Sequence, residues 1–210
     1  MEAVFPQVVL RIFGIPIRDT VISTWVMMIA VSALVYLLQR RQPDALGMVV
    51  EFVLDTGVSI MRRSAEPYLP LLGSLTIFIA VSNAFGAVPV FVAPTRDINT
   101  PLALALVVGG AVHYYGVREK GLGGYLRALA NPIFTLPLEL IGQVSRTLSL
   151  TLRLFGNVIS TEIIVAVVSS LVPLVVPLVF VAFSMFTGAL QAYIFTVLAA
   201  VYIGSAVASD

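Results

Sequence analysis

The stretch that decides the fold is Glu139–Glu162, ELIGQVSRTLSLTLRLFGNVISTE. It is apolar enough to lie in a lipid bilayer, yet it carries four charged residues: Glu139, Arg146, Arg153 and Glu162. A charge at membrane depth costs at least about 2.5 kcal/mol by insertion scales, so it persists only where protein, water or an opposite charge receives it. These four residues are therefore the first candidates for a functional site.

Helical periodicity divides the polar residues of this stretch between two sides. Each residue of a helix advances by about 100°, so five side chains fall within about a third of a turn: Glu139, Gln143, Arg146, Arg153 and Asn157. Beside them runs a stripe of small residues: Ser145, Ser149, Gly156 and Ser160. Small residues let a second helix approach closely in a membrane, so we expect a partner surface there. Glu162 is about half a turn out of phase with Arg153 and is expected to point into the protein's own interior.

The composition indicates an integral membrane protein. The 210 residues are 59% hydrophobic and only 11% charged, with a mean hydropathy of +1.03. The chain has no cysteine and a single histidine, which excludes disulfides and thiolate sites and makes a histidine zinc site unexpected. No glycine-rich phosphate loop or nucleophile triad is found, so we expect no cofactor, metal or nucleotide site in this chain, and the net charge of +1 gives no reason to expect nucleic-acid binding.

Hydropathy and charge predict a single membrane domain that crosses the bilayer several times. We expect spans at about 20–39, 68–92 and 100–115, and an amphipathic helix at 43–63 on the cytoplasmic surface. Seven basic residues then fall on the inner side and three on the outer side, so the N-terminus is expected outside and the C-terminus in the cytoplasm. The first residues lack the pattern of a cleaved signal peptide.

Two segments follow the glycine-rich stretch at 121–132, which we expect to be a loop. As continuous helices, 133–172 and 177–208 would be roughly 60 and 45 Å long, against a hydrocarbon thickness of about 30 Å. They are therefore expected to form a strongly tilted antiparallel hairpin that turns at Pro173 and Pro177. The predicted fold class is an all-α membrane protein with five or six helices.

Several motifs resemble one family. SLTLRLFGNVISTE (149–162), LQAYIFTVLAAVYI (190–203), PTRDINTPLALAL (94–106) and the SNAFGAVP turn (82–89) are similar to subunit a of the F-type rotary ATP synthases. The resemblance covers most of the chain from about residue 70 onward. It implies a stator subunit in the bacterial inner membrane that contacts a ring of c subunits, the peripheral-stalk b subunits and lipid. Two aqueous half-channels would pass H⁺ or Na⁺ to and from the carboxylates of the ring.

The resemblance also implies a role for each matching residue. Arg153 would separate the half-channels and attract the deprotonated carboxylate of a c subunit, because an opposite charge lowers the pKa of a carboxyl group. Glu162 would belong to the outer half-channel and Glu139 to the inner one. Three further positions complete the expected ion pathway: Asn157, Gln191 and Ser184. Ser184 departs from the pattern, since some members have a histidine there, and this leaves room for a sodium-coupled version.

Two other classes of function remain open at this point. A self-contained secondary transporter would use the same carboxylates, although such folds usually contain inverted repeats and none is found here. A purely structural membrane anchor would tolerate apolar residues at 153 and 162. A salt bridge within the helix does not explain Arg153, because Glu139 lies about four turns away and Glu162 points the opposite way.

Overall fold

The protein is a bundle of helices with a short β-hairpin at its N-terminal end. A computed structural model describes residues 8–12, 15–41, 43–86, 93–129, 135–172 and 176–208. The elements in these ranges follow one another as β1 (Val8–Ile12), β2 (Ile15–Arg18), α1 (Asp19–Arg41), α2 (Pro43–Met61), η2 (Glu66–Tyr68), α3 (Leu69–Gly86), η3 (Pro94–Arg96), α4 (Asn99–Leu129), α5 (Thr135–Leu171) and α6 (Val176–Val207). The six α-helices confirm the predicted all-α fold class, and the antiparallel pair β1–β2 is the one addition.

Five of the helices in the described ranges are long and apolar enough to cross a membrane: α1, α3 together with η2, α4, α5 and α6. Helices therefore occupy the segments at which spans were expected, and α2 occupies the segment expected to lie on the membrane surface. Helix α3 ends at Gly86, and the remainder of the expected span, 87–92, lies outside the described residues. The packing of α2 against α3 and α6 covers part of the bundle core.

The glycine-rich stretch after the third span is not a loop, contrary to the expectation. Helix α4 is interrupted at Gly121, whose φ of 71° and ψ of 161° are non-helical and lie where glycine is favoured, and a second helical segment runs from there to Leu129. The glycines at 123 and 124 lower helix propensity by only about 1 kcal/mol each, so the residues around them keep this second segment helical. The residues at 130–134 lie outside the described part of the chain.

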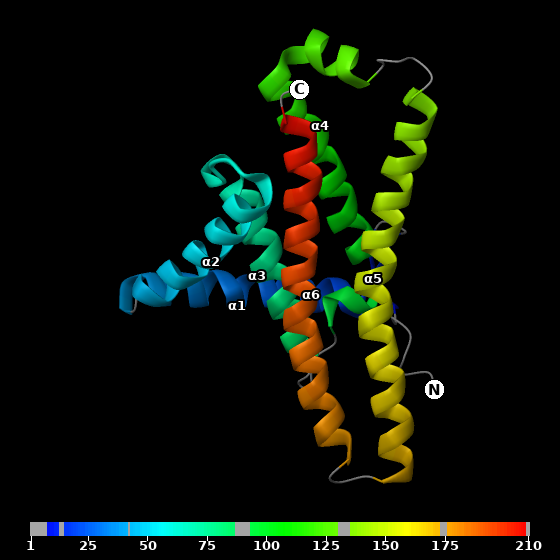
Figure 1. Ribbon diagram of the computed structural model, residues 1–210. Coiled ribbons are helices and arrows are strands. Elements are labelled where there is room, and N and C mark those ends of the chain that lie inside the picture. Colours follow the sequence, from blue (N-terminus) through cyan, green and yellow to red (C-terminus); the bar gives the residue numbers. More distant parts are fainter. Residues whose placement is uncertain are drawn as a thin grey trace.

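Helices α5 and α6 form the predicted antiparallel hairpin, which is the longest feature of the molecule (Figure 1). They contain 37 and 32 residues, or about 55 and 48 Å at 1.5 Å per residue. Helix α1 runs across the direction of the hairpin in this view, and the C-terminus lies at the end opposite to the turn. Pro177 lies in the first turn of α6, while Pro173 is outside the described residues.

The core forms around the C-terminal half of α6. Its buried positions recur every three or four residues, as expected for one face of a helix, and they are Gly188, Gln191, Ala192, Phe195, Thr196, Ala199, Ala200, Ile203 and Val207. Helix α3 packs against this face, and the hydroxyl groups of Thr76 and Thr196 form a buried hydrogen bond of 2.6 Å. Close packing continues at Gly188, where an added Cβ would lie 2.7 Å from the Cβ of Asn83.

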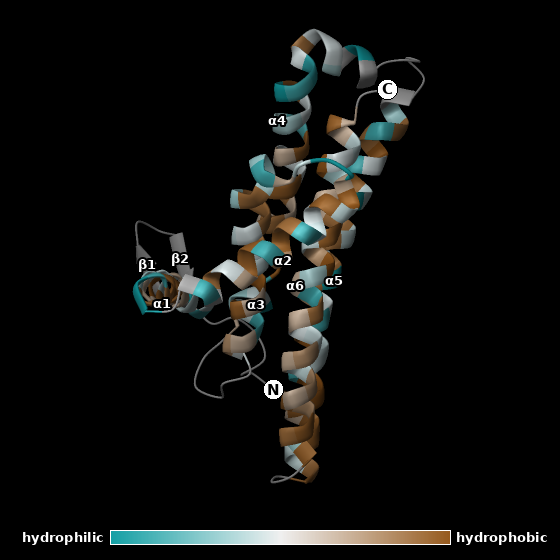
Figure 2. Cartoon of the chain, turned by 60° about the vertical axis from the view of Figure 1, so that its left-hand side comes forward, coloured by the Kyte–Doolittle hydropathy of each residue, from teal (hydrophilic) through white to brown (hydrophobic). Residues whose placement is uncertain are grey.

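The turn end of the hairpin extends beyond this core. Its residues are mostly hydrophobic (Figure 2), and large side chains there are exposed, including Leu171 at 75% and Leu178 at 69%. Exposed apolar surface of this extent on long helices is suited to lipid or to a hydrophobic partner. The hairpin therefore has one end anchored in the bundle and one end presented outward.

Candidate functional site

Arg153 occupies the middle of α5 and points outward. Its neighbours Leu150, Thr151 and Leu154 are buried and form the inward side of the helix, whereas Arg153 itself is exposed. It forms no ion pair with any other described residue. The guanidinium group is therefore available to an opposite charge from outside the chain.

The small-residue stripe lies on the open surface of the same helix. Ser145, Ser149 and Ser160 are exposed. Gly156 is half-buried, and a Cβ added to it would have no atom within 4 Å among the described residues. The stripe is thus unoccupied by the chain's own helices, as a surface for close helix approach requires.

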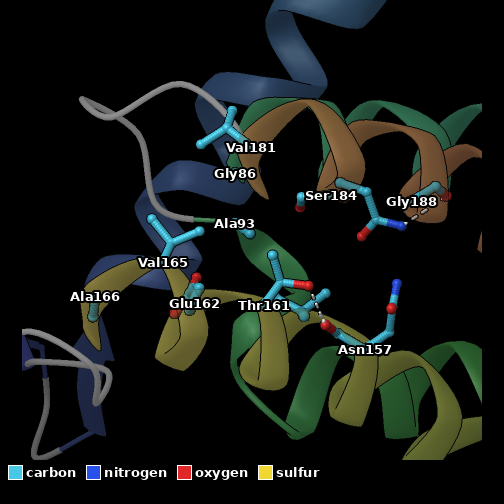
Figure 3. A pocket seen from close by; sticks show the side chains of 12 residues that line it. Gly86, Ala93, Asn157, Thr161, Glu162, Val165, Ala166, Val181, Ser184 and Gly188 are labelled. Carbon is cyan, nitrogen blue, oxygen red and sulfur yellow. Dashed lines mark hydrogen bonds between the residues drawn. The ribbon is translucent and has the colours of Figure 1, made fainter. Parts of the chain in front are cut away.

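A cavity of about 260 Å³ lies between α5 and α6 (Figure 3). Asn157, Thr161 and Glu162 line it from α5, and Ser184 and Gly188 line it from α6. The remaining lining residues come from α3, α5, α6 and the start of η3: Asn83, Gly86, Ala93, Val158, Val165, Ala166 and Val181. The structure thus brings together three of the residues expected on the ion pathway, namely Asn157, Glu162 and Ser184.

Glu162 is ion-paired at this cavity. The Nε of Arg96 lies 3.0 Å from Oε2 of Glu162, and the two side chains are 8% and 25% exposed. Arg96 comes from η3, the short helical turn between α3 and α4. Sequence reasoning assigned Arg96 only to an outer loop and missed this pairing, although a charged residue in so apolar a chain was a signal that a partner should be sought.

A second ion pair holds the same turn. Nη1 of Arg18 donates a hydrogen bond of 2.7 Å to Oδ2 of Asp97, and the backbone N–H of Asn99 donates to Oδ1. Burial alone would raise the pKa of Asp97, but the hydrogen bonds from Arg18 and Asn99 outweigh it and leave the pKa below its ordinary value. Asp97 therefore stays ionised and fixes the start of α4 to the end of β2.

Two buried amides lie at or near the cavity: Asn83 lines it, and Gln191 lies three residues after the lining residue Gly188. Nδ2 of Asn83 donates to the backbone carbonyl of Gly188, and Oδ1 of Asn83 accepts a hydrogen bond from Thr95. Gln191 lies one turn further along α6, is 5% exposed, and its Nε2 has no hydrogen-bond partner among the described residues. A buried amide in this condition is uncommon outside functional sites. Sequence reasoning identified Gln191 but not Asn83.

The other charges of the polar stripe behave differently from Arg153. Nη1 of Arg146 lies 3.4 Å from Oε1 of Glu139, and the Arg146 guanidinium also stands 5.4 Å from the centre of the Tyr202 ring. Gln143 approaches α4 at Gly109. The expectation of one continuous stripe facing a partner was therefore wrong in part, because the kinked α4 and the end of α6 contact its N-terminal half.

No group of three or more histidine, aspartate or glutamate side chains in the described ranges is arranged to hold a metal ion. The polar groups at the cavity are a carboxylate, amides and hydroxyls. Such groups suit the transient binding of water, protons or a small cation.

Comparison with known proteins finds one family to which this chain is similar. The family model described as ATP synthase A chain matches residues 21–204. A protein named ATP synthase subunit a 2, from Bradyrhizobium sp. strain BTAi1, is 44% identical over 93% of this chain and 91% of its own length. ATP synthase subunit a 1 of Crocosphaera subtropica is 37% identical over 91% of this chain and 87% of its own length. A similar relative from Acaryochloris marina, subunit a 2, is 43% identical over 79% of this chain and 71% of its own.

Proposed function

The chain belongs to the ATP synthase A chain family and is an ion-translocating stator subunit of an F-type ATP synthase, and we propose that Arg153 and the Glu162 cavity carry the translocation. One observation supports this proposal most directly. Arg153 lies at the centre of an apolar helix, faces outward and forms no ion pair with the described residues. A buried cation in a membrane needs an opposite charge, and here that charge is proposed to come from another chain.

The partner is proposed to be a ring of c subunits, each with an ion-binding carboxylate. Arg153 attracts the ionised carboxylate as it passes, and this attraction favours release of the bound ion. Desolvation against lipid then favours the neutral, ion-loaded form as the ring turns away. Alternation of these two environments couples ion movement to rotation, and the open stripe of small residues beside Arg153 supports close approach of the ring helices.

Two separate aqueous approaches are required on either side of Arg153. The cavity lined by Asn157, Glu162 and Ser184 is proposed as part of the outer half-channel, and Gln191 as a polar residue between the cavity and Arg153. Glu139 is proposed to lie toward the inner half-channel, where it is partly exposed beside Arg146. The fixed guanidinium of Arg153 keeps the two approaches from joining, since a cation crossing directly would have to pass a like charge.

The distribution of basic residues supports one orientation in the membrane. We propose a multi-pass protein of the bacterial plasma membrane with its N-terminus outside and its C-terminus in the cytoplasm, because seven basic residues then lie inside. The peripheral-stalk b subunits are proposed as further partners. Each H⁺ or Na⁺ that crosses contributes about 2.3 kcal/mol per 100 mV of membrane potential.

The proposal is tested with Arg153→Ala in the assembled complex reconstituted into vesicles. We expect the variant complex to assemble with its c ring, because Arg153 is exposed and packs no core, but to lose ion-driven ATP synthesis. Arg146→Ala is the matched control, since Arg146 is a second arginine of α5 that already has a partner within the chain. Retained synthesis in Arg153→Ala would refute the role of this residue.

A second measurement separates the stator from a secondary transporter. The purified single chain in liposomes is expected to conduct no coupled ion flux, because the proposed pathway is completed only by a carboxylate of the ring. Substantial flux from the single chain would favour the transporter.

A further inference from the structure

The ion pair between Arg96 and Glu162 joins two parts of the chain that are distant in sequence. Arg96 ends the turn η3, and Glu162 lies in the C-terminal half of α5. The Nε to Oε2 distance is 3.0 Å, and the arginine side chain is 8% exposed. Glu162 lines the cavity, whereas Arg96 is not among the residues that line it.

We propose that Arg96 is a positioning residue for ion transfer, whose permanent charge holds the Glu162 carboxylate at the cavity wall and limits how firmly that carboxylate retains the transported ion. This inference rests on the proposed function of the cavity as an ion pathway. Conduction requires a site that binds the ion well enough to admit it and weakly enough to release it. A carboxylate in an apolar setting without a counter-charge would hold a proton or a cation tightly, and a fixed guanidinium opposes this.

The chemistry of the cavity supports an arginine in this role. The facing wall of α6 contributes the neutral hydroxyl of Ser184, and α3 contributes the neutral amide of Asn83. A guanidinium group remains protonated at any pH at which the protein is folded, and its planar fork sets the direction of a carboxylate more narrowly than an ammonium group does. The positive charge beside Glu162 is therefore constant and does not itself relay protons.

Two further carboxylates lie near the pair: Asp19 interacts with Glu162, and Asp97 attaches the turn η3, which carries Arg96, to the rest of the bundle. The carboxylate of Asp19, at the start of α1, is close enough to interact electrostatically with Glu162. Asp97, the residue after Arg96, is bound by Arg18 and by the backbone of Asn99. The turn that carries Arg96 is thus attached to β2 and α4 on one side and to α5 on the other, which fixes Arg96 relative to the cavity.

A purely structural clamp between η3 and α5 would use the same pair, so the test must distinguish the two roles. The decisive variant is Arg96→His, because an imidazole has an unperturbed pKa of about 6.5 and makes the cation titratable. ATP synthesis is measured per assembled complex in vesicles, with a fixed membrane potential and the outer-facing compartment buffered between about pH 5.5 and 8.5. Each rate is divided by that of the unaltered complex at the same pH.

We expect the ratio for Arg96→His to approach one at the acidic end and to fall about tenfold toward the alkaline end, as one charge-assisted hydrogen bond is lost. Arg96→Gln is expected to be low throughout. Arg63→His is the control, because Arg63 forms an ion pair with Glu119 at 2.7 Å that is exposed and lies away from the cavity. Its ratio should not change with outer pH. A flat, undiminished ratio for Arg96→His, or full activity of Arg96→Gln, would overturn the proposal.

If single variants fail to assemble, the double variant Arg96→Glu with Glu162→Arg tests whether the pair is only a structural clamp. A clamp would be restored by the exchange, and recovery of assembly and synthesis would assign the pair to structure and overturn the proposal. We expect no recovery of synthesis, because the carboxylate no longer lines the cavity. Arg153→Ala distinguishes failure of this inference from failure of the proposed function. If Arg153→Ala loses synthesis while Arg96→Gln retains full synthesis, only the role of Arg96 is refuted.

Discussion

Arg153 and Glu162 lie on one helix but occupy opposite environments. Arg153 is exposed on the outward side of α5 and forms no ion pair with the described residues, whereas Glu162 is three-quarters buried and paired with Arg96 at a cavity. Their spacing along α5 places the two side chains about 180° apart around the helix axis. The short helix η3 supplies the cation Arg96 only to Glu162. A single α-helix can therefore present an available charge to the outside of the subunit and a compensated charge to an internal cavity.

The largest effect is expected when the guanidinium group of Arg153 is replaced by an ammonium group. Arg153→Lys keeps the positive charge but loses the planar fork, so ion-driven ATP synthesis should fall by about tenfold or more. Synthesis per assembled complex is measured in vesicles, with Arg146→Lys as the control. The lysine control should stay within about twofold of the unaltered rate, because the Arg146 pair is partly exposed. Equal rates for the two variants would remove the contrast between an available and a compensated arginine.

A smaller loss is expected on the compensated side. Glu162→Gln keeps the size of the side chain but leaves Arg96 buried beside a neutral group, and we expect synthesis to fall by no more than about tenfold and by less than in Arg153→Lys. The same vesicle assay and a thermal unfolding scan of the purified complex provide the readouts. Full activity together with unchanged stability would show that the carboxylate is not needed at the cavity.

Substitutions at two glycines compare the packed side of the hairpin, at Gly188, with its open side, at Gly156. Gly188→Ala would place a Cβ 2.7 Å from that of Asn83, so the melting temperature of the isolated subunit should fall, with a cost of about 1–3 kcal/mol. Gly156→Ala meets open space in the subunit and should leave its melting temperature unchanged or raised. If the stripe contacts the ring, Gly156→Ala should instead reduce assembly with c subunits. A drop in subunit stability for Gly156→Ala would contradict the open surface.

Acid titration tests the attachment of the turn that carries Arg96. The pKa of Asp97 is lowered in the folded protein, so its pairing with Arg18 stabilises the fold above about pH 4 and is lost as the pH falls further. The difference in stability between the unaltered subunit and Asp97→Asn, about 1 kcal/mol at neutral pH, should therefore shrink below about pH 4. Melting temperatures of the detergent-solubilised subunit at several pH values provide the measurement. Arg18→Gln should reproduce the effect, and a constant difference across this range would exclude the pairing.

The smallest effect is expected near the N-terminal end of α5. Glu139 and Arg146 are 3.4 Å apart, with side chains 44% and 36% exposed, so water can replace either partner. Glu139→Gln should lower synthesis by about twofold in the vesicle assay. A loss as large as that of Glu162→Gln would place Glu139 on an enclosed pathway instead.

Several of these features could be predicted from local sequence. The lengths of the apolar runs predicted the long helices, because a hydrophobic stretch of about 20 residues is what a bilayer requires. The half-turn offset between Arg153 and Glu162 predicted their opposite directions, since helical phase depends only on spacing. The motifs around Arg153 and Gln191 were sufficient to indicate the family.

Other features depended on contacts that local patterns do not encode. The glycine-rich stretch from Gly121 was expected to be a loop, but only Gly121 itself leaves the helical conformation there, and a second helical segment follows it to Leu129. The Arg146 side of the polar stripe was expected to face a partner, but the chain's own Tyr202 and Glu139 contact it. Hydrophobic periodicity identifies which residues share a face, not which neighbour covers that face.

The sequence by itself determined that this is a helical membrane protein of one family, with an arginine and a glutamate on opposite sides of a long helix, because these properties follow from composition, spacing and motif. Only the tertiary structure decided that Arg96 pairs with Glu162, that Asn83 packs against Gly188, and that Arg153 forms no ion pair with the described residues. These pairings join segments distant along the chain, and their geometry is defined only when α3, η3, α5 and α6 pack together.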